Sequence, residues 1–292
     1  MKNFLKKHNI LVAPMEGVMR PAVMEVCNAL DLADCWMTPF FRVSETVPKV
    51  RELKRFLEPF APEKKPVILQ IMGNNAEKLS ETARRALEAG ARGIDLNCGC
   101  PSCQVIRHSA GAASMLEYER TAKILEALRN ALGENFLSVK TRLGFYETSE
   151  SEKFLPLWEK AGEVDLFTLH FRTATEAYKP THGRDERLLL ARNLLKNALV
   201  FGNGDLADSH EAEKLCSHAR LNGAMIGRNF WRNPLMFKNP DTPPETARRI
   251  FWEQLSALPY GEKHWAKGSA IEMAVLIFGK DSPEANELKK QF

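Results

Sequence analysis

Residues 94–101 read Ile-Asp-Leu-Asn-Cys-Gly-Cys-Pro, and this octet is the most informative stretch for the fold. It predicts a short apolar strand that runs directly into a turn carrying Cys100. Other chemically useful side chains occupy the same place, at the ends of other predicted strands. The (β/α)8 barrel collects strand ends on one face, and its active site lies on that face. The residues placed in this way are Gln70, Lys140, His170, the Asn203-Gly204-Asp205 turn and the Gly227-Arg228 pair.

Strand-like and helix-like stretches alternate from residue 10 to residue 237, which predicts an α/β fold of the (β/α)8 TIM barrel type. A doubly wound sheet is the alternative, but it rarely uses eight successive parallel strands. The predicted strands cover residues 10–14, 35–41, 66–71, 93–97, 137–142, 164–170, 198–203 and 223–227. The predicted helices cover residues 20–30, 45–60 with an interruption near Pro48, 76–89, 119–132, 150–161, 186–196, 208–219 and 229–237.

The barrel pattern stops at a proline-rich segment, residues 238–244, which no helix or strand is expected to cross. Helices are predicted beyond it at residues 245–258, 262–278 and 283–290. A segment this short is too small to be stable alone, so we expect it to pack on the barrel. The sequence therefore predicts two domains, a barrel over residues 1–238 and a small helical domain over residues 239–292.

Composition limits the class of protein. The chain has 292 residues, of which 44% are hydrophobic, but no run approaches the roughly 18 apolar residues that a membrane span needs. The first seven residues become polar too soon for a secretory signal, and the six cysteines resemble reduced thiols rather than a disulfide framework. We therefore expect a cytoplasmic protein without a membrane partner. The net charge of +4 permits a polyanionic partner without requiring one.

A phosphate site is predicted after the last two strands of the barrel. Residues 201–207, Phe-Gly-Asn-Gly-Asp-Leu-Ala, match the glycine pattern of dinucleotide-binding folds, but they follow the seventh strand rather than the first. In barrels, phosphate commonly binds after strands seven and eight, beside a short extra helix. Gly227, Arg228 and Asn229 supply the second half of such a site, so the architecture predicts a bound phosphate.

The other strand ends suggest what carries that phosphate. Lys140 and His170 would point into the barrel mouth, and the Gln70 amide can donate and accept at once. A flavin suits this mixture, because its pyrimidine edge alternates donors and acceptors and gains negative charge on reduction. Each residue alone is more simply an ordinary surface residue. Because such residues occur at the ends of several strands, a flavin site is the favoured interpretation.

In these motifs the chain resembles the tRNA-dihydrouridine synthases, over residues 10–237. Glu16 and residues 38–48 look most like the C-type enzymes, which modify position 16 of the tRNA D-loop. The segments that carry the resemblance are residues 13–18 (Ala-Pro-Met-Glu-Gly-Val), 95–101 (Asp-Leu-Asn-Cys-Gly-Cys-Pro), 139–144 (Val-Lys-Thr-Arg-Leu-Gly), 170–173 (His-Phe-Arg-Thr), 202–205 (Gly-Asn-Gly-Asp) and 225–228 (Met-Ile-Gly-Arg) with 233–234 (Asn-Pro).

The resemblance implies FMN as cofactor, NADPH as transient reductant and tRNA as substrate of a monomeric enzyme with no DNA partner. It also implies that residues 239–292 contact the tRNA. By similarity, Cys100 would be the proton donor in catalysis. By the same similarity, the isoalloxazine would contact Pro14, Met15, Glu16, Gln70, Lys140 and His170, the FMN phosphate would contact Asn203, Gly204, Asp205, Gly227 and Arg228, and the uracil would face Asn97, Arg142 and Tyr178.

The chemistry of a pyrimidine is consistent with this assignment. Hydride added at C6 leaves negative charge toward C5, and an acid must then protonate C5 from the other face. A cysteine thiol, with an ordinary pKa of about 8.5, is mostly protonated at neutral pH and can serve as that acid. We expect Cys98, two residues before Cys100, to point to the same side but lie deeper.

Several features depart from the family pattern. Arg20-Pro21 replaces an acidic residue followed by apolar ones, Phe171 replaces a glycine and would add bulk at the mouth, and residues 108–113 are poorer in glycine. Residues 241–292 contain 7 Lys and Arg against 8 Asp and Glu, so the helical domain is not basic. A second basic region is either a solvated helix face or an RNA-facing rim, and it comprises Arg42, Lys49, Arg51, Lys54, Arg55, Lys64 and Lys65.

Two other functions remain open from the sequence. One is an FMN-barrel oxidoreductase for a small pyrimidine or enone, and the other is a flavin- and RNA-binding paralogue without turnover. The sequence also leaves open which uridine is reduced and whether NADPH or NADH is preferred. Cys98, Cys100 and Cys103 could form half of a metal site, but no second pair with suitable spacing follows, so we expect no metal.

Overall fold

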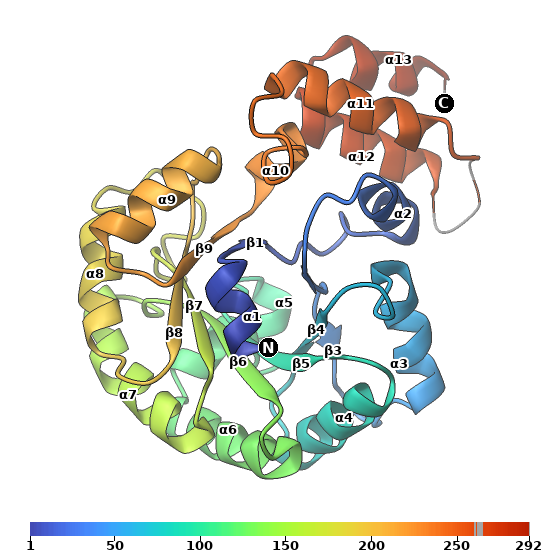
Figure 1. The fold of residues 1–292 in the computed structure, drawn as a ribbon. Helices are drawn as coiled ribbons and strands as arrows, with labels where there is room; N and C mark the ends of the chain where they lie inside the picture. Colours follow the sequence, from blue (N-terminus) through green and yellow to red (C-terminus); the bar gives the residue numbers. More distant parts are fainter. Residues whose placement is uncertain (260, 262–264, 292) are drawn as a thin grey trace.

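The computed structural model describes residues 1–259, 261 and 265–291. Its strands form one parallel sheet in the order β1-β9-β8-β7-β6-β5-β4-β2, curled into a nearly closed barrel (Figure 1). The predicted TIM barrel is confirmed. The strands are β1 (Ile10–Val12), β2 (Trp36–Met37), β3 (Phe41–Arg42), β4 (Val67–Met72), β5 (Gly93–Cys98), β6 (Phe136–Arg142), β7 (Leu166–His170), β8 (Leu199–Asn203) and β9 (Gly223–Ile226).

The second predicted strand, residues 35–41, is in fact two short strands. β2 and β3 both pair with β4, and Pro39 lies between them. Proline has no backbone N–H for the ladder, so the strand is interrupted there. The chain resumes pairing at Phe41, opposite Ile71.

Helices cover the outside of the barrel, as predicted (Figure 1). Two of them begin at a side-chain cap, since Asn75 accepts from the Lys78 amide and Asp208 accepts from the Glu211 amide. The barrel helices are α2 (Pro21–Ala29), α3 (Val50–Leu57), α4 (Ala76–Glu88), α6 (Tyr118–Leu132), α7 (Ser151–Gly162), α8 (Arg184–Asn193), α9 (Ser209–His218) and α10 (Arg228–Arg232).

Two of these helices are much shorter than predicted, and proline explains both differences. The helix predicted over residues 45–60 begins only at Val50, after Pro48, and ends in a 3-10 turn over Glu58–Phe60. The helix predicted over residues 229–237 ends at Arg232, because Asn233 precedes Pro234 and is held out of helical geometry.

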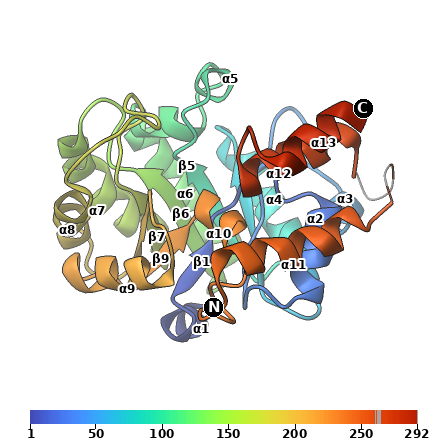
Figure 2. The same ribbon diagram turned by 90° about the horizontal axis from the view of Figure 1, so that it is seen from above.

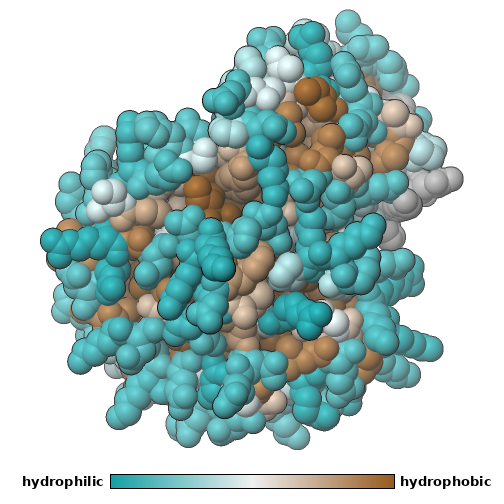
Figure 3. All heavy atoms as spheres, in the orientation of Figure 1, coloured by the Kyte–Doolittle hydropathy of each residue, from teal (hydrophilic) through white to brown (hydrophobic). Residues whose placement is uncertain are grey.

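A helix that was not predicted, α1 (Lys2–Lys7), lies at the end of the barrel opposite the mouth (Figures 1 and 2). Its Leu5 is fully buried in a cluster inside the barrel that includes Phe136, Phe201 and Met225. Leu5 is the one fully buried side chain of this helix, so the sequence of the helix shows no repeating pattern of apolar residues from which it could be predicted. The face on which α1 lies is covered mainly by hydrophilic residues (Figure 3).

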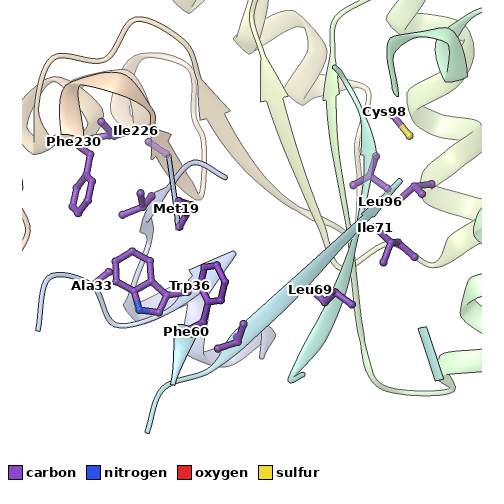
Figure 4. Close-up of a cluster of buried hydrophobic side chains, with 14 of the residues drawn as sticks. Met19, Ala33, Trp36, Phe60, Leu69, Ile71, Leu96, Cys98, Ile226 and Phe230 are labelled. Carbon is purple, nitrogen blue, oxygen red and sulfur yellow. The ribbon is translucent and has the colours of Figure 1, made fainter. Parts of the chain in front are cut away.

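The barrel wall separates two apolar layers, because successive side chains of a strand point to opposite faces. The inner cluster fills the barrel below the mouth. The outer cluster lies between the strands and the helices, and Figure 4 shows part of it, with Leu69 and Ile71 of β4 and Leu96 and Cys98 of β5. Polar residues that face inward near the strand ends therefore lie on top of the inner cluster.

Three helices follow the proline-rich segment and lie together at one side of the barrel (Figure 2). They are α11 (Pro244–Ser256), α12 (Lys267–Phe278) and α13 (Pro283–Gln291). α11 contacts α2, and Phe251 and Leu255 join the outer apolar layer of the barrel, so the segment packs on the barrel as expected. The first residues of the helix predicted over 262–278 include 262–264, which lie outside the described residues.

Within the part of the chain that the structure describes, no helix has the length and apolar character needed to cross a membrane.

Candidate active site

A cavity of about 660 Å³ opens at the carboxyl ends of the strands. Its size is typical of sites for small ligands and cofactors. Its lining includes every predicted site residue, namely Pro14, Met15, Glu16, Gln70, Asn97, Cys100, Lys140, Arg142, His170, Tyr178, Asn203, Gly204, Asp205, Gly227 and Arg228. The tertiary structure thus brings together residues from all parts of the barrel.

Sequence reasoning missed two polar or aromatic side chains of the lining, Phe40 and Arg232. Arg232 follows Arg228 by one helical turn on α10, so the i, i+4 spacing was a usable signal. Asn229 donates to the Leu206 carbonyl over 2.8 Å, which ties α10 to the loop after β8. Phe40 follows the Pro39 interruption, and no sequence signal identified it.

Cys100 is held by a turn that begins where β5 ends. Asn97 Oδ1 accepts from the backbone N–H of Gly99 over 3.1 Å and from that of Cys100 over 3.0 Å. The Cys100 carbonyl accepts from the Ala112 amide over 3.0 Å. An asparagine side chain that bonds the backbone two and three residues later is a common way to end regular structure. The result is a partly exposed thiol at the wall of the cavity.

One glycine is essential to this arrangement. Gly111 has a φ of +58°, and a Cβ there would lie 2.8 Å from the Cys100 carbonyl oxygen and 2.6 Å from the Val105 side chain. Segment 108–113 is poor in glycine, yet it keeps glycine at a position that packs directly against Cys100.

Cys98 does not lie where we expected. Its side chain is fully buried in the outer apolar layer beside Leu96 (Figure 4), on the opposite face of the wall from the cavity. The expectation that Cys98 and Cys100 point to the same side is wrong, because the strand ends at Cys98 and the chain turns before Cys100. Burial raises the pKa of Cys98 to about 12, so this thiol stays neutral.

The amides of Gln70 and Asn97 bond to each other across neighbouring strands. Asn97 Nδ2 donates to Gln70 Oε1 over 2.8 Å, and Gln70 Nε2 donates downward to the carboxylate of Asp95, also over 2.8 Å. Gln70 is only 1% exposed. Most of its hydrogen-bonding capacity is therefore used within the protein, and one lone pair of its oxygen remains for a ligand.

Lys140 and His170 form the polar floor beside these amides. Lys140 Nζ donates to Asn203 Oδ1 over 3.0 Å, and Asn203 Nδ2 donates to the Met225 carbonyl over 2.8 Å. Burial, and then the charge of Arg142, lower the pKa of Lys140 to about 8. The ammonium is thus still the main form at neutral pH.

His170 is neutral in this setting. Burial, and then four nearby cations led by Lys140, hold its pKa well below the ordinary value. The Arg172 amide donates to His170 Nδ1 over 3.3 Å, which places the ring hydrogen on Nε2. A neutral imidazole with a donor at Nε2 can hold a ligand that carries partial negative charge.

The loops after β8 and β9 form a cationic corner of the cavity. Gly204 and Asp205 have positive φ values of +119° and +52°. Arg228 Nη2 lies 3.9 Å from the Asp205 carboxylate, and its side chain is 58% exposed, so it is free to turn toward a ligand. The backbone N–H groups of Arg228 and Asn229 precede the first backbone bond of α10, which Phe230 donates to the Gly227 carbonyl over 3.0 Å. This donor set fits a phosphate group.

Phe171 is not at the mouth. It is 1% exposed, its ring stacks on His170 at 5.6 Å, and the guanidinium of Arg172 lies 4.5 Å from its ring centre. A Cβ on Gly204 would approach the Phe171 ring to 2.6 Å. The predicted bulk at the mouth is therefore wrong, since the phenylalanine packs beneath the loop and requires glycine above it.

Arg142 and Tyr178 form the outer wall. Arg142 is 3% exposed and donates to the carbonyls of Gly99, Thr173 and Ala177 over 2.8–3.0 Å, which ties the Cys100 turn to the loop after β7. Tyr178 is 64% exposed, and the guanidinium carbons of Arg142 and Arg228 lie 5.5 and 5.6 Å from its ring centre. A flat ring entering the mouth meets this aromatic and cationic surface.

Met15 and Glu16 complete the lining next to the C-terminal helices. Met15 Sδ accepts from Trp231 Nε1 over 3.3 Å. Burial raises the pKa of Glu16, and the charge of Arg20 partly offsets this effect. Arg20 in turn pairs with Glu272 of α12 over 3.3 Å, so the loop after β1 joins the cavity to the helical segment.

The basic region on and around α3 is only partly available for a partner. Arg42, Lys49, Arg51 and Lys54 are exposed. Lys65 instead pairs with Asp31 and donates to the Ala33 carbonyl. Since α3 follows the carboxyl end of β3, its first residues lie on the side of the mouth.

The model of the dihydrouridine synthase family (Dus) matches residues 11–265 of this chain. The chain belongs to this family. It is 30% identical over 231 residues to the tRNA-dihydrouridine(16) synthase of Haemophilus influenzae, with 77% of this chain and 74% of that protein covered. It is 31% identical to the enzyme of the same name from Escherichia coli K12, with 77% and 73% covered. A probable tRNA-dihydrouridine synthase of Staphylococcus aureus (strain COL) is 30% identical, with 78% and 70% covered.

Solved structures support the barrel fold of this family member. The structure of TcOYE with pHBA superposes with a TM-score of 0.64 at 9% identity, covering 86% of this chain and 95% of that one. The complex of 2-naphthoyl-CoA reductase with 2-naphthoyl-CoA gives a TM-score of 0.62 at 12% identity, covering 83% and 49%. At these identities the similarity concerns the fold alone.

Proposed function

We propose that this protein uses FMN and NAD(P)H to reduce uridine to 5,6-dihydrouridine in tRNA, at position 16 of the D-loop. The observation that carries the proposal is the mouth cavity, where the Cys100 thiol and the cationic corner of Arg228 line the same space. Membership of the dihydrouridine synthase family, and relatives that are named for position 16, support the reaction and the position.

FMN fits the residues present. A bound flavin supplies the hydride for C6 of the uracil. The phosphate would be held by the loop of Asn203, Gly204 and Asp205 and by Gly227 and Arg228, whose donors and positive charge suit an anion. The Asp205 carboxylate would act by orienting Arg228 rather than by contacting the phosphate. The neutral His170 and the cationic Lys140 would lie beside the ring system, together with Pro14, Met15, Glu16 and Gln70.

The uracil would lie between the ring system and Cys100. Asn97 has a second N–H that its bond to Gln70 does not use, and this donor suits a uracil carbonyl. Tyr178 and Arg142 would cover the outer face of the base. Cys100 would donate its proton to C5, which completes the saturation of the C5=C6 bond.

The remainder of the tRNA would contact the surface around the mouth. We propose the exposed basic side chains at Arg42, Lys49, Arg51 and Lys54 and the helical domain over residues 239–292 as that surface. Since residues 241–292 carry 7 basic against 8 acidic residues, the basic rim would supply most of the attraction for phosphates.

Mapping of dihydrouridine in tRNA from cells with and without this protein tests the proposal. We expect dihydrouridine at position 16 to disappear without the protein and to return with the parent chain. Loss at another position would correct the site, and no loss at any position would overturn the function.

The acidic balance of the C-terminal helices favours one second candidate, a flavin-barrel oxidoreductase for a small pyrimidine or enone. Binding of the purified protein to tRNA separates the two. Reduction of free uracil without any affinity for tRNA would favour the small-molecule enzyme.

A further inference from the structure

Asp95 of β5 is a buried carboxylate that belongs to no predicted role. It is fully buried and does not line the cavity. Its Oδ1 accepts from Ser138 Oγ over 2.6 Å, and its Oδ2 accepts from Gln70 Nε2 over 2.8 Å. Burial raises its pKa to about 6, against the opposing effects of these two bonds and of Lys140. At neutral pH the group is therefore mainly ionised, and both oxygens act as acceptors.

The carboxylate determines the direction of the Gln70 amide. An ionised carboxylate can only accept, so Gln70 must present its NH₂ group to Asp95. Its oxygen then faces Asn97 and accepts from Nδ2 over 2.8 Å. If the Gln70 amide were reversed, its oxygen would face the carboxylate and its NH₂ group would face the NH₂ group of Asn97.

The direction of the Asn97 amide determines the turn that carries Cys100. With Nδ2 directed to Gln70, the Asn97 oxygen faces the backbone N–H groups of Gly99 and Cys100. It accepts hydrogen bonds from them over 3.1 and 3.0 Å. A reversed Asn97 amide would place a donor against these two donors. The direction of every bond from Asp95 to Cys100 is thus consistent with one fixed acceptor at Asp95.

We propose that Asp95 is a positioning residue for Cys100, acting through Gln70 and Asn97 along the inner face of the barrel. The acceptor at Asp95 sets the direction of the Gln70 amide, and through it the direction of the Asn97 amide. The proposal rests on the proposed function, in which Cys100 donates a proton to C5. Displacement of a reacting group by about 1 Å can cost on the order of 10²-fold in rate.

Three single variants separate this role from general stability. Asp95→Leu has a similar shape but offers Gln70 no acceptor. Asp95→Asn still offers an oxygen to Gln70, because its NH₂ group can donate to Ser138, whose hydroxyl can accept. Ser138→Ala is the matched control, since it removes the other hydrogen bond of the same carboxylate and leaves the bond to Gln70 in place.

Hydrogen–deuterium exchange of the backbone amides of Gly99 and Cys100 is the direct readout. We expect their exchange to be about tenfold faster or more in Asp95→Leu, and near the parent rate in Asp95→Asn and Ser138→Ala. The amides of Val139 and Leu169, within the neighbouring strands, are the internal reference. Equal acceleration of these reference amides would show general destabilisation and would overturn the positioning role.

Turnover gives the second readout. Per bound flavin, dihydrouridine formation should fall about 10²-fold in Asp95→Leu, and should stay within about threefold of the parent in Asp95→Asn and Ser138→Ala. Oxidation of NADPH should change little in all three. A parent rate in Asp95→Leu, or an equal loss in Asp95→Asn, would overturn the proposal.

If Asp95→Leu does not fold, the double variant Asp95→Asn with Ser138→Ala provides another route. The amide introduced at position 95 then lacks the Ser138 hydroxyl that would accept its N–H, so no hydrogen bond keeps its oxygen directed toward Gln70. Exchange at Gly99 and Cys100 should rise although each single change has little effect, and an additive result would contradict the proposal. Hydrogen–deuterium exchange needs neither tRNA nor NADPH. If the parent protein forms no dihydrouridine, the proposed function is contradicted, and the exchange measurements still test the role of Asp95.

Discussion

The side chains of Cys98 and Cys100 lie on opposite sides of the barrel wall, although only Gly99 separates them in sequence. Cys98 is fully buried among the residues that join strand β5 to the helices, and Cys100 lines the mouth cavity. The turn centred on the Asn97 side chain causes this difference, because it reverses the ordinary alternation of a strand.

This relationship predicts different effects for the two cysteines. Cys100→Ala should lower dihydrouridine formation by about 10²–10⁴-fold, the usual worth of one acid–base group, while flavin content and NADPH oxidation stay near normal. Cys98→Ala should leave turnover close to the parent and reduce stability by about 1 kcal/mol, since it removes one buried sulfur atom. Single-turnover assays with tRNA and denaturant titrations measure both effects. The reverse order of turnover would assign the acid to Cys98.

Replacement of Arg228 tests the cofactor site. We expect the purified protein to be yellow with non-covalent FMN rather than FAD, because the phosphate corner closes the cavity. Arg228→Ala should weaken FMN binding by about 1.5–3 kcal/mol through loss of a charge-assisted contact. Fluorescence titration of the apoprotein with FMN measures this change, and Arg249→Ala, in an exposed ion pair on α11, is the control for loss of one positive charge. Extraction of FAD, or of no flavin from folded protein, would contradict the assignment.

Charge reversal on α3 tests the RNA surface. Changing Lys49, Arg51 and Lys54 to Glu should weaken tRNA binding and flatten its dependence on salt, because fewer counterions are released. Reduction of the flavin by NADPH should be unaffected. Binding is measured at several salt concentrations.

The matched control reverses the exposed Lys123, Lys153 and Lys160 on helices α6 and α7, which lie away from α3 (Figure 1). This control should bind tRNA like the parent. If the α3 variant keeps the parent affinity, the RNA surface lies elsewhere.

Stability should depend on pH through Asp95. The pKa of this carboxyl is raised on folding from 3.8 to about 6, so its contribution is fully present below pH 3.8 and is lost as the pH rises through about 6. Asp95→Asn removes this titration. Relative to the parent, the free energy of unfolding of the variant should therefore rise by up to about 3 kcal/mol between pH 4 and pH 7.5. Denaturant titrations at both values measure it.

Asp34 provides a control of opposite sign. Partial burial raises its pKa, but hydrogen bonds from Lys238 and His8 hold the net pKa below the usual value. Asp34→Asn should thus lose stability relative to the parent as the pH rises through the acid range. A difference between Asp95→Asn and the parent that does not change with pH would contradict the assignment for Asp95.

Local sequence patterns are enough to predict the barrel and the residues that line its mouth. Strand ends in a parallel barrel meet at one face, so a motif such as Asp95–Pro101 predicts both the strand and the position of Cys100 at the mouth. The same reasoning predicts that Lys140, His170 and Arg228 share one cavity, and all three line it. Two prolines account for details in which the structure differs from the predicted elements. Pro39 interrupts the second strand, and Pro48 delays the start of α3 to Val50.

Where a strand ends, the face on which each side chain lies depends on contacts with distant parts of the chain. Cys98 and Phe171 were both placed wrongly, since each lies at or just beyond the end of a strand, where alternation no longer predicts direction. The helix α1 depends on one side chain, Leu5, that fits a space formed by distant strands. The path from Asp95 to Cys100 runs through strands β4 and β5, and its order follows from hydrogen-bond directions between residues far apart in sequence. Such directions depend on which donors and acceptors face one another in space, and the order of residues along the chain does not contain that information.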